Sequence, residues 1–334
     1  MRKILSIASL LVCALVASAQ DIHFSQFFAA PLQINPANTG NFNGIVRIGG
    51  NYRDQWSSFT VPYRTFNVYT DAAIQPKKAV NRFGLGISAY NDQAGDGDLT
   101  TTKANLSAAY HIGYTDHTYF RMAFGLSGGI VQKKVNINKL VFDSQWNDFT
   151  FDPDLPNNEP DVIETIQYAD VAAGTMMTFT PNEGERYAFG FSASHINTPN
   201  ETFFNADNKV GIRYTLTGAG QFATAGIANI QPQFFVSTQD NALEIIAGTN
   251  VSFLMNMEES TSKAVFIGAW YRHTDAVWMV GGAQLDNLTF SFSYDFNISP
   301  LRTASRSFGG LELAVVYIFN NKEKLDPLKC PAYQ

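Results

Sequence analysis

Histidine and cysteine are the residue types in this chain best suited to bind a metal or act as catalysts. Neither is arranged for that chemistry. The five histidines are His23, His111, His117, His195 and His273. None of them forms a pair at metal-ligand spacing, and none lies beside a cysteine. The two cysteines offer no zinc site either, so we expect neither a metal nor a cofactor.

Ser107 and His111 are the nearest serine and histidine on one face of one predicted strand. Four residues along a strand span about 13 Å, which is far beyond hydrogen-bond reach. A neighbouring strand would have to supply the missing partner of a nucleophile. We therefore predict that the chain is not an enzyme and has no catalytic residues, and a surface hydrolase is the weakest alternative.

The segment 91–98 reads Asn-Asp-Gln-Ala-Gly-Asp-Gly-Asp, and its three carboxylates could hold Ca²⁺. It lacks the full EF-hand spacing and the distal glutamate. A glycine-rich tight loop with solvated acids is the favoured interpretation.

Composition argues against an ordinary water-facing globule. Only 16% of the residues are charged, whereas soluble proteins average about 25%. The net charge is −6, and no basic block is present to neutralise a phosphate backbone. Nucleic-acid binding is thereby excluded as a function class.

Residues 1–19 have the pattern of a cleaved secretory signal peptide. A basic pair (2–3) precedes an apolar run (4–16) and the small residues Ala-Ser-Ala (17–19). The apolar run is shorter than the roughly 20 residues of a spanning helix. We predict cleavage before Gln20, which leaves one cysteine and hence no internal disulfide.

Alternation of apolar and polar residues runs through the rest of the chain, as a half-buried strand requires. It is clearest over residues 288–297, where four aromatic side chains and a leucine alternate with Thr, Ser, Asp and Asn. The same pattern predicts strands at 44–54, 63–73, 82–91, 102–113, 119–132, 168–179, 186–196, 209–222, 228–238, 242–254, 263–272, 276–285, 287–297 and 309–319. The strand with Pro232 fits least well, because proline cannot donate to a ladder.

An even count of strands, most of them near the roughly 9 to 11 residues of tilted membrane strands, favours an all-β transmembrane antiparallel β-barrel with 14 strands. Long loops at 133–167 and 197–208 alternate with short turns at 113–117 and 180–185, as expected for extracellular and periplasmic ends. A soluble β-sandwich is the alternative. Together with the signal peptide, the pattern predicts an integral outer-membrane protein.

The face assignment makes further predictions. The polar face, expected to line the lumen, contains Arg47, Asn51, Arg53, Lys103 and Arg121. Aromatic residues near strand ends are consistent with interface girdles, and they are Tyr110, Tyr187, Trp270, Trp278 and Tyr317. A charge placed on the lipid face should be costly, and a change on the lumen face should be mild.

Two stretches do not alternate and are our candidates for partner binding. Residues 20–42 form either a plug in or beneath the barrel or a plain leader. The acidic and aromatic loop 133–167 forms either a folded cap and partner surface or a mobile loop. The candidate residues are His23, Phe24, Gln26, Phe27, Asn35 and Pro36 in the first stretch and Trp146, Phe149, Phe151 and Asp152 in the second. The chain thus divides into 1–19 (signal peptide), 20–42, 43–319 (barrel) and 320–334 (tail).

The start of the mature chain resembles a known family. The run HFSQF at 23–27, followed by Pro31-Leu32, Asn35-Pro36-Ala37 and Thr39-Gly40, is similar to the opening signature of the PorP/SprF family of type IX secretion system membrane proteins. Further blocks agree in order, namely 51–56 (NYRDQW), 91–97 (NDQAGDG), 195–201 (HINTPNE), 268–272 (GAWYR) and 293–297 (SYDFN). Phe28 stands where the family often has Tyr, and the tail 330–334 matches loosely.

The resemblance implies an outer-membrane barrel of Bacteroidota-type bacteria that works in type IX secretion or gliding motility. It implies partners among type IX secretion components, a large secreted adhesin with a type IX C-terminal domain, and a periplasmic peptidoglycan-associated lipoprotein. Outer-membrane lipid surrounds such a barrel. The alternative function is a porin-like channel for a small solute, because fourteen strands can enclose a polar lumen.

Overall fold

The structure is a computed structural model, and it describes residues 21–57, 61–76, 80–113, 120–152, 154–158, 163–182, 184–204, 206–224, 227–258, 261–300 and 302–320. The predicted signal peptide, its cleavage site and residues 321–334 of the predicted tail lie outside these ranges. No helix within them has the length and apolar character needed to cross a membrane.

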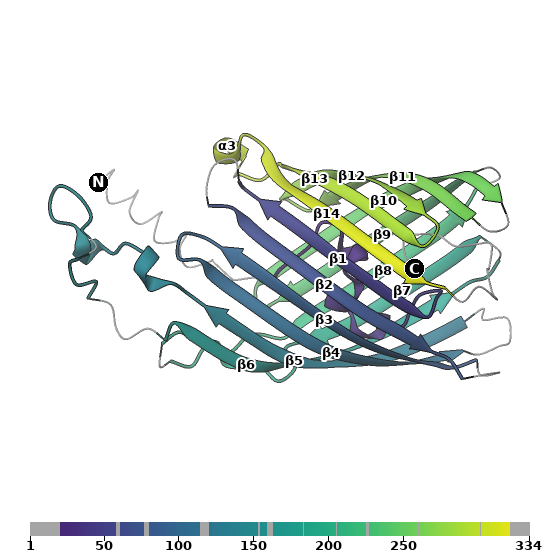
Figure 1. The fold of residues 1–334 in the computed structure, drawn as a ribbon, viewed down its shortest axis with the longest axis horizontal. Helices are drawn as coiled ribbons and strands as arrows, with labels where there is room; N and C mark the ends of the chain where they lie inside the picture. Colours follow the sequence, from purple (N-terminus) through teal and green to yellow (C-terminus); the bar gives the residue numbers. More distant parts are fainter. Residues whose placement is uncertain are drawn as a thin grey trace.

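Fourteen antiparallel strands in the described residues form one closed barrel, as Figure 1 shows. The strands are β1 (Val46–Gln55), β2 (Tyr63–Ile74), β3 (Arg82–Ala94), β4 (Leu99–Gly113), β5 (Phe120–Lys134), β6 (Thr165–Phe179), β7 (Glu185–Ser194), β8 (Arg213–Ala223), β9 (Ala228–Gln239), β10 (Ala242–Glu258), β11 (Thr261–Arg272), β12 (Ala276–Leu285), β13 (Leu288–Asn297) and β14 (Phe308–Phe319). Each strand pairs with its neighbours in sequence, and β1 pairs with β14 to close the wall. The predicted all-β fold and its strand count are confirmed.

The alternation in the sequence becomes the two faces of this wall. In β13, Phe290 and Phe292 are exposed on the outside, whereas Ser291, Ser293 and Asp295 are buried inside. Successive side chains of a strand point to opposite faces, so one apolar residue in two is enough to build a lipid-facing surface.

Pro232 is accommodated by a break in one ladder. The pairing of β8 with β9 stops after Ala219 and Gln233 and resumes at Phe222 and Ile230. Pro232 falls in this gap, while the ladder from β9 to β10 continues past it. The missing N–H therefore breaks no regular pairing, and the barrel stays closed.

The connections differ in length at the two ends of the barrel. Residues 135–164, with the short helices η3 (Ile137–Lys139) and η4 (Asp143–Gln145), and residues 195–212 leave one end. The first of these connections projects well beyond the wall in Figure 1. Long loops mark the extracellular end of an outer-membrane barrel.

Residues 21–45, which we call the lumen segment, run inside the barrel (Figure 1). They form three short helical turns, η1 (Phe27–Ala29), α2 (Pro31–Ile34) and η2 (Pro36–Asn38). Proline begins both α2 and η2. Because proline cannot continue a preceding helix, these two residues keep the turns before them, η1 and α2, short. The segment starts beside the extracellular loops and leaves at the opposite end, where Ile45 bonds to the last residue of β14.

Candidate functional site

Lumen-facing glycines form the surface on which the lumen segment packs. A Cβ added to Gly125 of β5 would lie 2.3 Å from the backbone nitrogen of Ala37. A Cβ added to Gly84 of β3 would lie 2.0 Å from the carbonyl oxygen of Thr39. Real atoms do not approach this closely, so the segment can occupy its place only because these positions have no side chain.

Asn35 joins the segment to the wall through its side-chain Nδ2 group and caps η2 through its Oδ1. Its Nδ2 donates to the carbonyl oxygens of Thr175 (2.9 Å) and Phe191 (3.2 Å). Its Oδ1 accepts from the backbone nitrogen of Ala37 (2.9 Å) and caps η2. Gly174 leaves room for this amide, because a Cβ there would lie 2.1 Å from Oδ1. Asn35 is thus placed as a structural anchor inside the barrel.

A buried charge cluster holds the segment near the start of η1. Glu312 of β14 accepts from the backbone nitrogens of Ser25 (2.7 Å) and Gln26 (3.1 Å). Asp295 of β13 accepts from the hydroxyl of Ser25 (2.6 Å) and pairs with Arg53 of β1 (3.1 Å). Burying charges is costly unless they are paired and hydrogen-bonded. The segment therefore completes a network that the wall alone leaves incomplete.

The side chain of Gln26 extends the same network along the wall. Its Oε1 accepts from the hydroxyl of Ser291 (2.5 Å), and its Nε2 donates to the hydroxyl of Ser293 (3.2 Å). The Nε2 group also donates to the carbonyl oxygen of Glu312 (3.1 Å). Gln26 has no exposed surface. The polar side-chain atoms of Gln26, one of the predicted partner-binding residues, are therefore engaged by the barrel wall.

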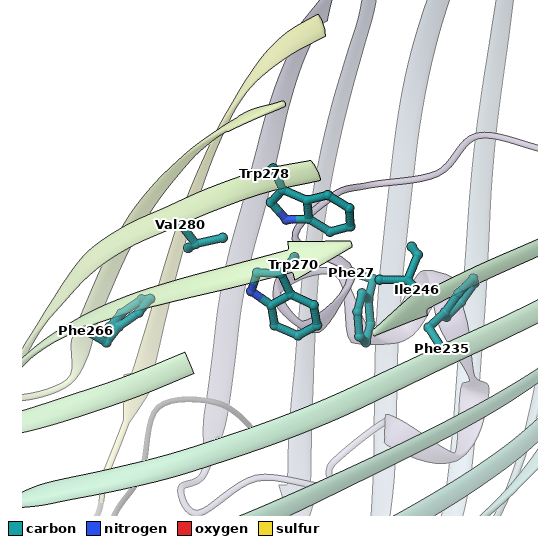
Figure 2. Close-up of a cluster of buried hydrophobic side chains, with 7 residues drawn as sticks. All are labelled: Phe27, Phe235, Ile246, Phe266, Trp270, Trp278 and Val280. Carbon is teal, nitrogen blue, oxygen red and sulfur yellow. The ribbon is translucent and has the colours of Figure 1, made fainter. Parts of the chain in front are cut away.

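Phe27 fills an aromatic pocket in the wall, as Figure 2 shows. Its ring lies 5.4 Å from that of Phe235 and 5.5 Å from that of Trp270, the latter edge to face. The Phe28 ring stacks on Trp270 at 5.4 Å, and the Trp278 ring stacks on Trp270 at 6.0 Å. Such aromatic pairs contribute about 0.5 to 1.5 kcal/mol each beyond their burial.

This pocket corrects one prediction about the aromatic girdle. Trp270 and Trp278 are 3% and 1% exposed and face the lumen. They are therefore not interface residues. The side chains of the lumen segment give these rings an apolar environment inside the barrel, which a water-filled lumen would not.

A second ion pair anchors the far part of the segment. Arg47 of β1 pairs with Asp71 of β2 (2.8 Å) and donates to the carbonyl oxygen of Asn38 (3.2 Å). Asp71 also accepts from the backbone nitrogen of Gly40 (2.7 Å), a residue with a φ of 72° that favours glycine. The Arg47 guanidinium lies over the ring of Phe42, 4.8 Å from its centre. Two of the predicted lumen-facing arginines, Arg47 and Arg53, thus contact the lumen segment.

Ser107 and His111 both contact Thr39. The Thr39 hydroxyl donates to the Ser107 hydroxyl (2.9 Å), and His111 Nε2 donates to the Thr39 carbonyl oxygen (2.8 Å). Both side chains are buried. In this arrangement they hold the lumen segment.

The extracellular end of the segment is held through His195, which directly follows β7. Its Nε2 lies 2.6 Å from Asp21, and its Nδ1 lies 2.7 Å from Asp170 of β6. Lys103 of β4 pairs with the other oxygen of Asp170 (2.5 Å). Burial opposes a charge on His195, but hydrogen bonds to the two carboxylates outweigh it and raise the pKa of His195 to about 9. His195 is therefore a cation at neutral pH.

The charge on Asp21 is favoured by the same contacts. Burial alone would raise its pKa, but the hydrogen bond and the charge of His195 hold the pKa of Asp21 well below its usual range. Arg213 adds a weaker ion pair at 3.5 Å. The start of the lumen segment is thus tied to two wall strands and a loop.

The Asp-rich segment 91–98 ends β3 with residues 91–94 and forms the tight turn to β4 with residues 95–98. Gly95 has a φ of 69°, as a glycine-rich turn requires. The Asp98 carboxylate pairs with Lys139 and accepts from Gln93. Over the described ranges, no three metal-binding side chains gather at one place.

The structure separates the ten candidate partner-binding residues into two groups. Phe24, Gln26, Phe27, Asn35 and Pro36 are buried in the lumen, and His23 is half-buried there. The loop group lies outside, where Trp146, Phe149 and Phe151 are 48%, 91% and 47% exposed. The rings of Trp146 and Phe151 pack at 5.0 Å, and Asp152 is half-buried beside them. Partner binding by either group stays a prediction.

Sequence reasoning missed the acidic partners of the lumen arginines. Asp71, Asp295 and Glu312 are all buried and lie on the polar face of predicted strands. A carboxylate in the middle of such a face, matched by arginines elsewhere, was the available signal. The pairing itself could not be read from the sequence because, for example, Arg53 and Asp295 are 242 residues apart.

A closed fourteen-stranded barrel with an apolar outer face and a packed lumen is an integral outer-membrane protein. The family model for type IX secretion system membrane proteins, PorP/SprF, matches residues 16–317, and the chain belongs to this family. No curated protein matches the chain.

Solved structures share the fold at low identity. The chain is similar to the Ralstonia pickettii toluene transporter TbuX, with 10% identity and a TM-score of 0.52 over 87% of this chain and 94% of that one. The Pseudomonas putida toluene transporter TodX gives 11% identity and a TM-score of 0.51 over 86% and 92%. At this identity the likeness shows the barrel fold alone.

Proposed function

We propose that this barrel is a non-enzymatic component of the type IX secretion and gliding machinery, and that it assists export or surface attachment of a specific large adhesin. The observation that carries the proposal is the occupied lumen. A segment bound through buried ion pairs, an aromatic pocket and a glycine surface is suited to a docking barrel, and it occupies lumen space that an open channel would leave free.

The exposed loop 135–164 is the surface we assign to the secreted partner. Phe149 is almost fully exposed, and it lies near the packed pair of Trp146 and Phe151. Aromatic anchors surrounded by polar side chains are typical of the energetic centres of interfaces. At the opposite end, the short turns are the place we assign to the periplasmic peptidoglycan-associated lipoprotein.

The docking role is tested by removing the exposed rings. We expect the double substitution Phe149→Ala with Phe151→Ala to reduce adhesin display and co-purification of the adhesin, because the anchors are lost. Phe204→Ala is the matched control, since this ring is 45% exposed on the other long loop. Heat-modifiable gel mobility confirms that each barrel folds. Unchanged adhesin display in the double variant would contradict the docking role of the loop and would indicate that it only caps the barrel.

A channel for a small solute is the alternative, and it requires the lumen segment to move. Single-channel recording on the purified barrel separates the two functions. The docking role predicts negligible conductance, whereas steady conductance with solute preference would support the channel.

A further inference from the structure

A cavity of about 670 Å³ lies at the extracellular end of the lumen, and we call it the vestibule. Asp21, Ile22 and His23 of the lumen segment contribute to its lining, together with the ends of β1 to β6, β10 and β11. Its size falls within the roughly 300 to 1,000 Å³ of ligand sites. The vestibule is therefore large enough for a short piece of chain or a small molecule.

One row of lumen-facing side chains crosses four strands of the vestibule wall. The register places Thr65, Asp92, Thr101 and Lys133 side by side on β2, β3, β4 and β5. Asp92 accepts from the Thr65 hydroxyl (2.6 Å). Lys133 is the cation of this row, but it pairs instead with Glu201 of the loop 195–212 (2.6 Å).

Asp92 consequently has no ion-pair partner among the described residues. The other acids of the vestibule are already matched, since Asp21 pairs with His195, and both Glu244 and Asp275 pair with Arg272. A half-buried carboxylate without an ion pair attracts a cation more strongly than an exposed one.

Aromatic and imidazole groups line the same cavity. The rings of Trp56 and Tyr63 pack at 4.8 Å, and Tyr90 is two residues from Asp92 on the same face of β3. Aromatic faces attract cations through their quadrupole. His23 Nε2 is buried and has no hydrogen-bond partner in the part of the chain that the structure describes. A ligand with several N–H donors would satisfy such a group.

We propose that the vestibule binds a guanidinium or ammonium group, with Asp92 as its counter-ion and the Trp56 and Tyr63 rings as its aromatic neighbours. A guanidinium fits best, because its five donors can serve a carboxylate and an imidazole together. The group belongs to an arginine or lysine in an extended segment of a secreted protein. Only this assignment to a protein rests on the proposed function, because the cation chemistry follows from the cavity itself.

The test uses the full-length mature barrel in detergent and isothermal titration calorimetry. The probe is a capped Gly-Arg-Gly-Arg peptide, compared with capped Gly-Glu-Gly-Glu and with spermidine. We expect the arginine peptide to bind and the glutamate peptide not to bind. Asp92→Asn should weaken binding of the arginine peptide at least tenfold, because the substitution keeps the shape of the side chain and removes its charge.

Asp207→Asn is the matched control, since this acid is exposed on the loop 195–212, away from the vestibule lining. It should leave the affinity unchanged. Tighter binding of spermidine than of the peptide would support the cation site and assign it to free amines. Equal affinity in Asp92→Asn and the unsubstituted barrel, or equal binding of both peptides, would overturn the site.

Discussion

His195 is the residue whose protonation most directly controls the start of the lumen segment. Its pKa is raised from 6.5 to about 9, so its contribution to holding Asp21 is complete below about pH 6.5 and is lost as the pH rises through about 9. The lowered pKa of Asp21 has the opposite sign, and its contribution is lost only in strong acid. The start of the segment should therefore be held at neutral pH and released in base.

A spin label at Ile22→Cys, in a Cys330→Ser background, measures this release. We expect its mobility to rise with a midpoint near pH 9, the folded-state pKa of His195. His195→Gln should leave the label mobile at every pH, because it removes the cation. A label that stays immobile from pH 7 to pH 10 would contradict the role of His195.

Phe292 and Ser291 test the two faces of a single strand. Phe292 is 51% exposed to lipid, and Phe292→Arg should cost about 2 to 4 kcal/mol near the bilayer midplane. Folding into lipid vesicles, followed by gel mobility, measures this loss. Phe292→Leu is the control and should fold normally.

The sequence predicted a mild effect for a change on the lumen face, and the structure revises that expectation for Ser291. Its hydroxyl donates to Gln26, and the side chain is 3% exposed. Ser291→Arg should therefore displace the lumen segment and destabilise the folded barrel by about 1 to 3 kcal/mol, as overpacking does. Increased conductance of a folded barrel is the expected sign, and an unchanged closed barrel would show that the lumen has spare room.

At the scale of elements, β5 offers two glycines with opposite surroundings. Gly125 faces the lumen segment at 2.3 Å from a backbone nitrogen, whereas Gly128 is exposed and has nothing within 4 Å. Gly125→Val should dislodge residues 35–40, because backbone atoms cannot yield as a flexible side chain does. Gly128→Val should be nearly neutral, since its side chain enters lipid.

Protease sensitivity of the segment and the midpoint of thermal unfolding compare these two variants. A lower midpoint and a cleavable segment in Gly125→Val alone would agree with the close packing. The same behaviour in both variants would point to strand strain in place of contact with the segment.

For the whole molecule, the lumen segment and the barrel wall act as one packed unit. The buried charges of Arg53, Asp295 and Glu312 are satisfied in part by backbone groups and the Ser25 hydroxyl of the segment. Removing one side of such a network leaves uncompensated buried charge, which is strongly destabilising. Deletion of residues 21–40 should therefore lower the thermal midpoint and open a conducting lumen. A deleted barrel that stays closed and equally stable would show that the segment has no part in either property.

The sequence by itself determined the wall of this protein. Alternation is a local property, so the strands, their faces and their even count could be read from neighbouring residues without knowing what they contact. The order of the strands followed as well, because short connections favour pairing between neighbours in sequence. Because alternation assigns each residue of a strand to a face, the lumen-facing position of Arg47, Asn51 and Arg53 was predictable.

Only the tertiary structure decided what fills the barrel. A polar inner face looks the same whether it borders water or a folded segment, so the alternation said nothing about residues 21–45. The register of β3 to β6 brings the glycines at 84, 125 and 174 into one row across the wall, and the contact of Ser25 with Glu312 joins residues 287 positions apart. The burial of Trp270 and Trp278 has the same origin, because the tertiary fold brings the lumen segment against their rings.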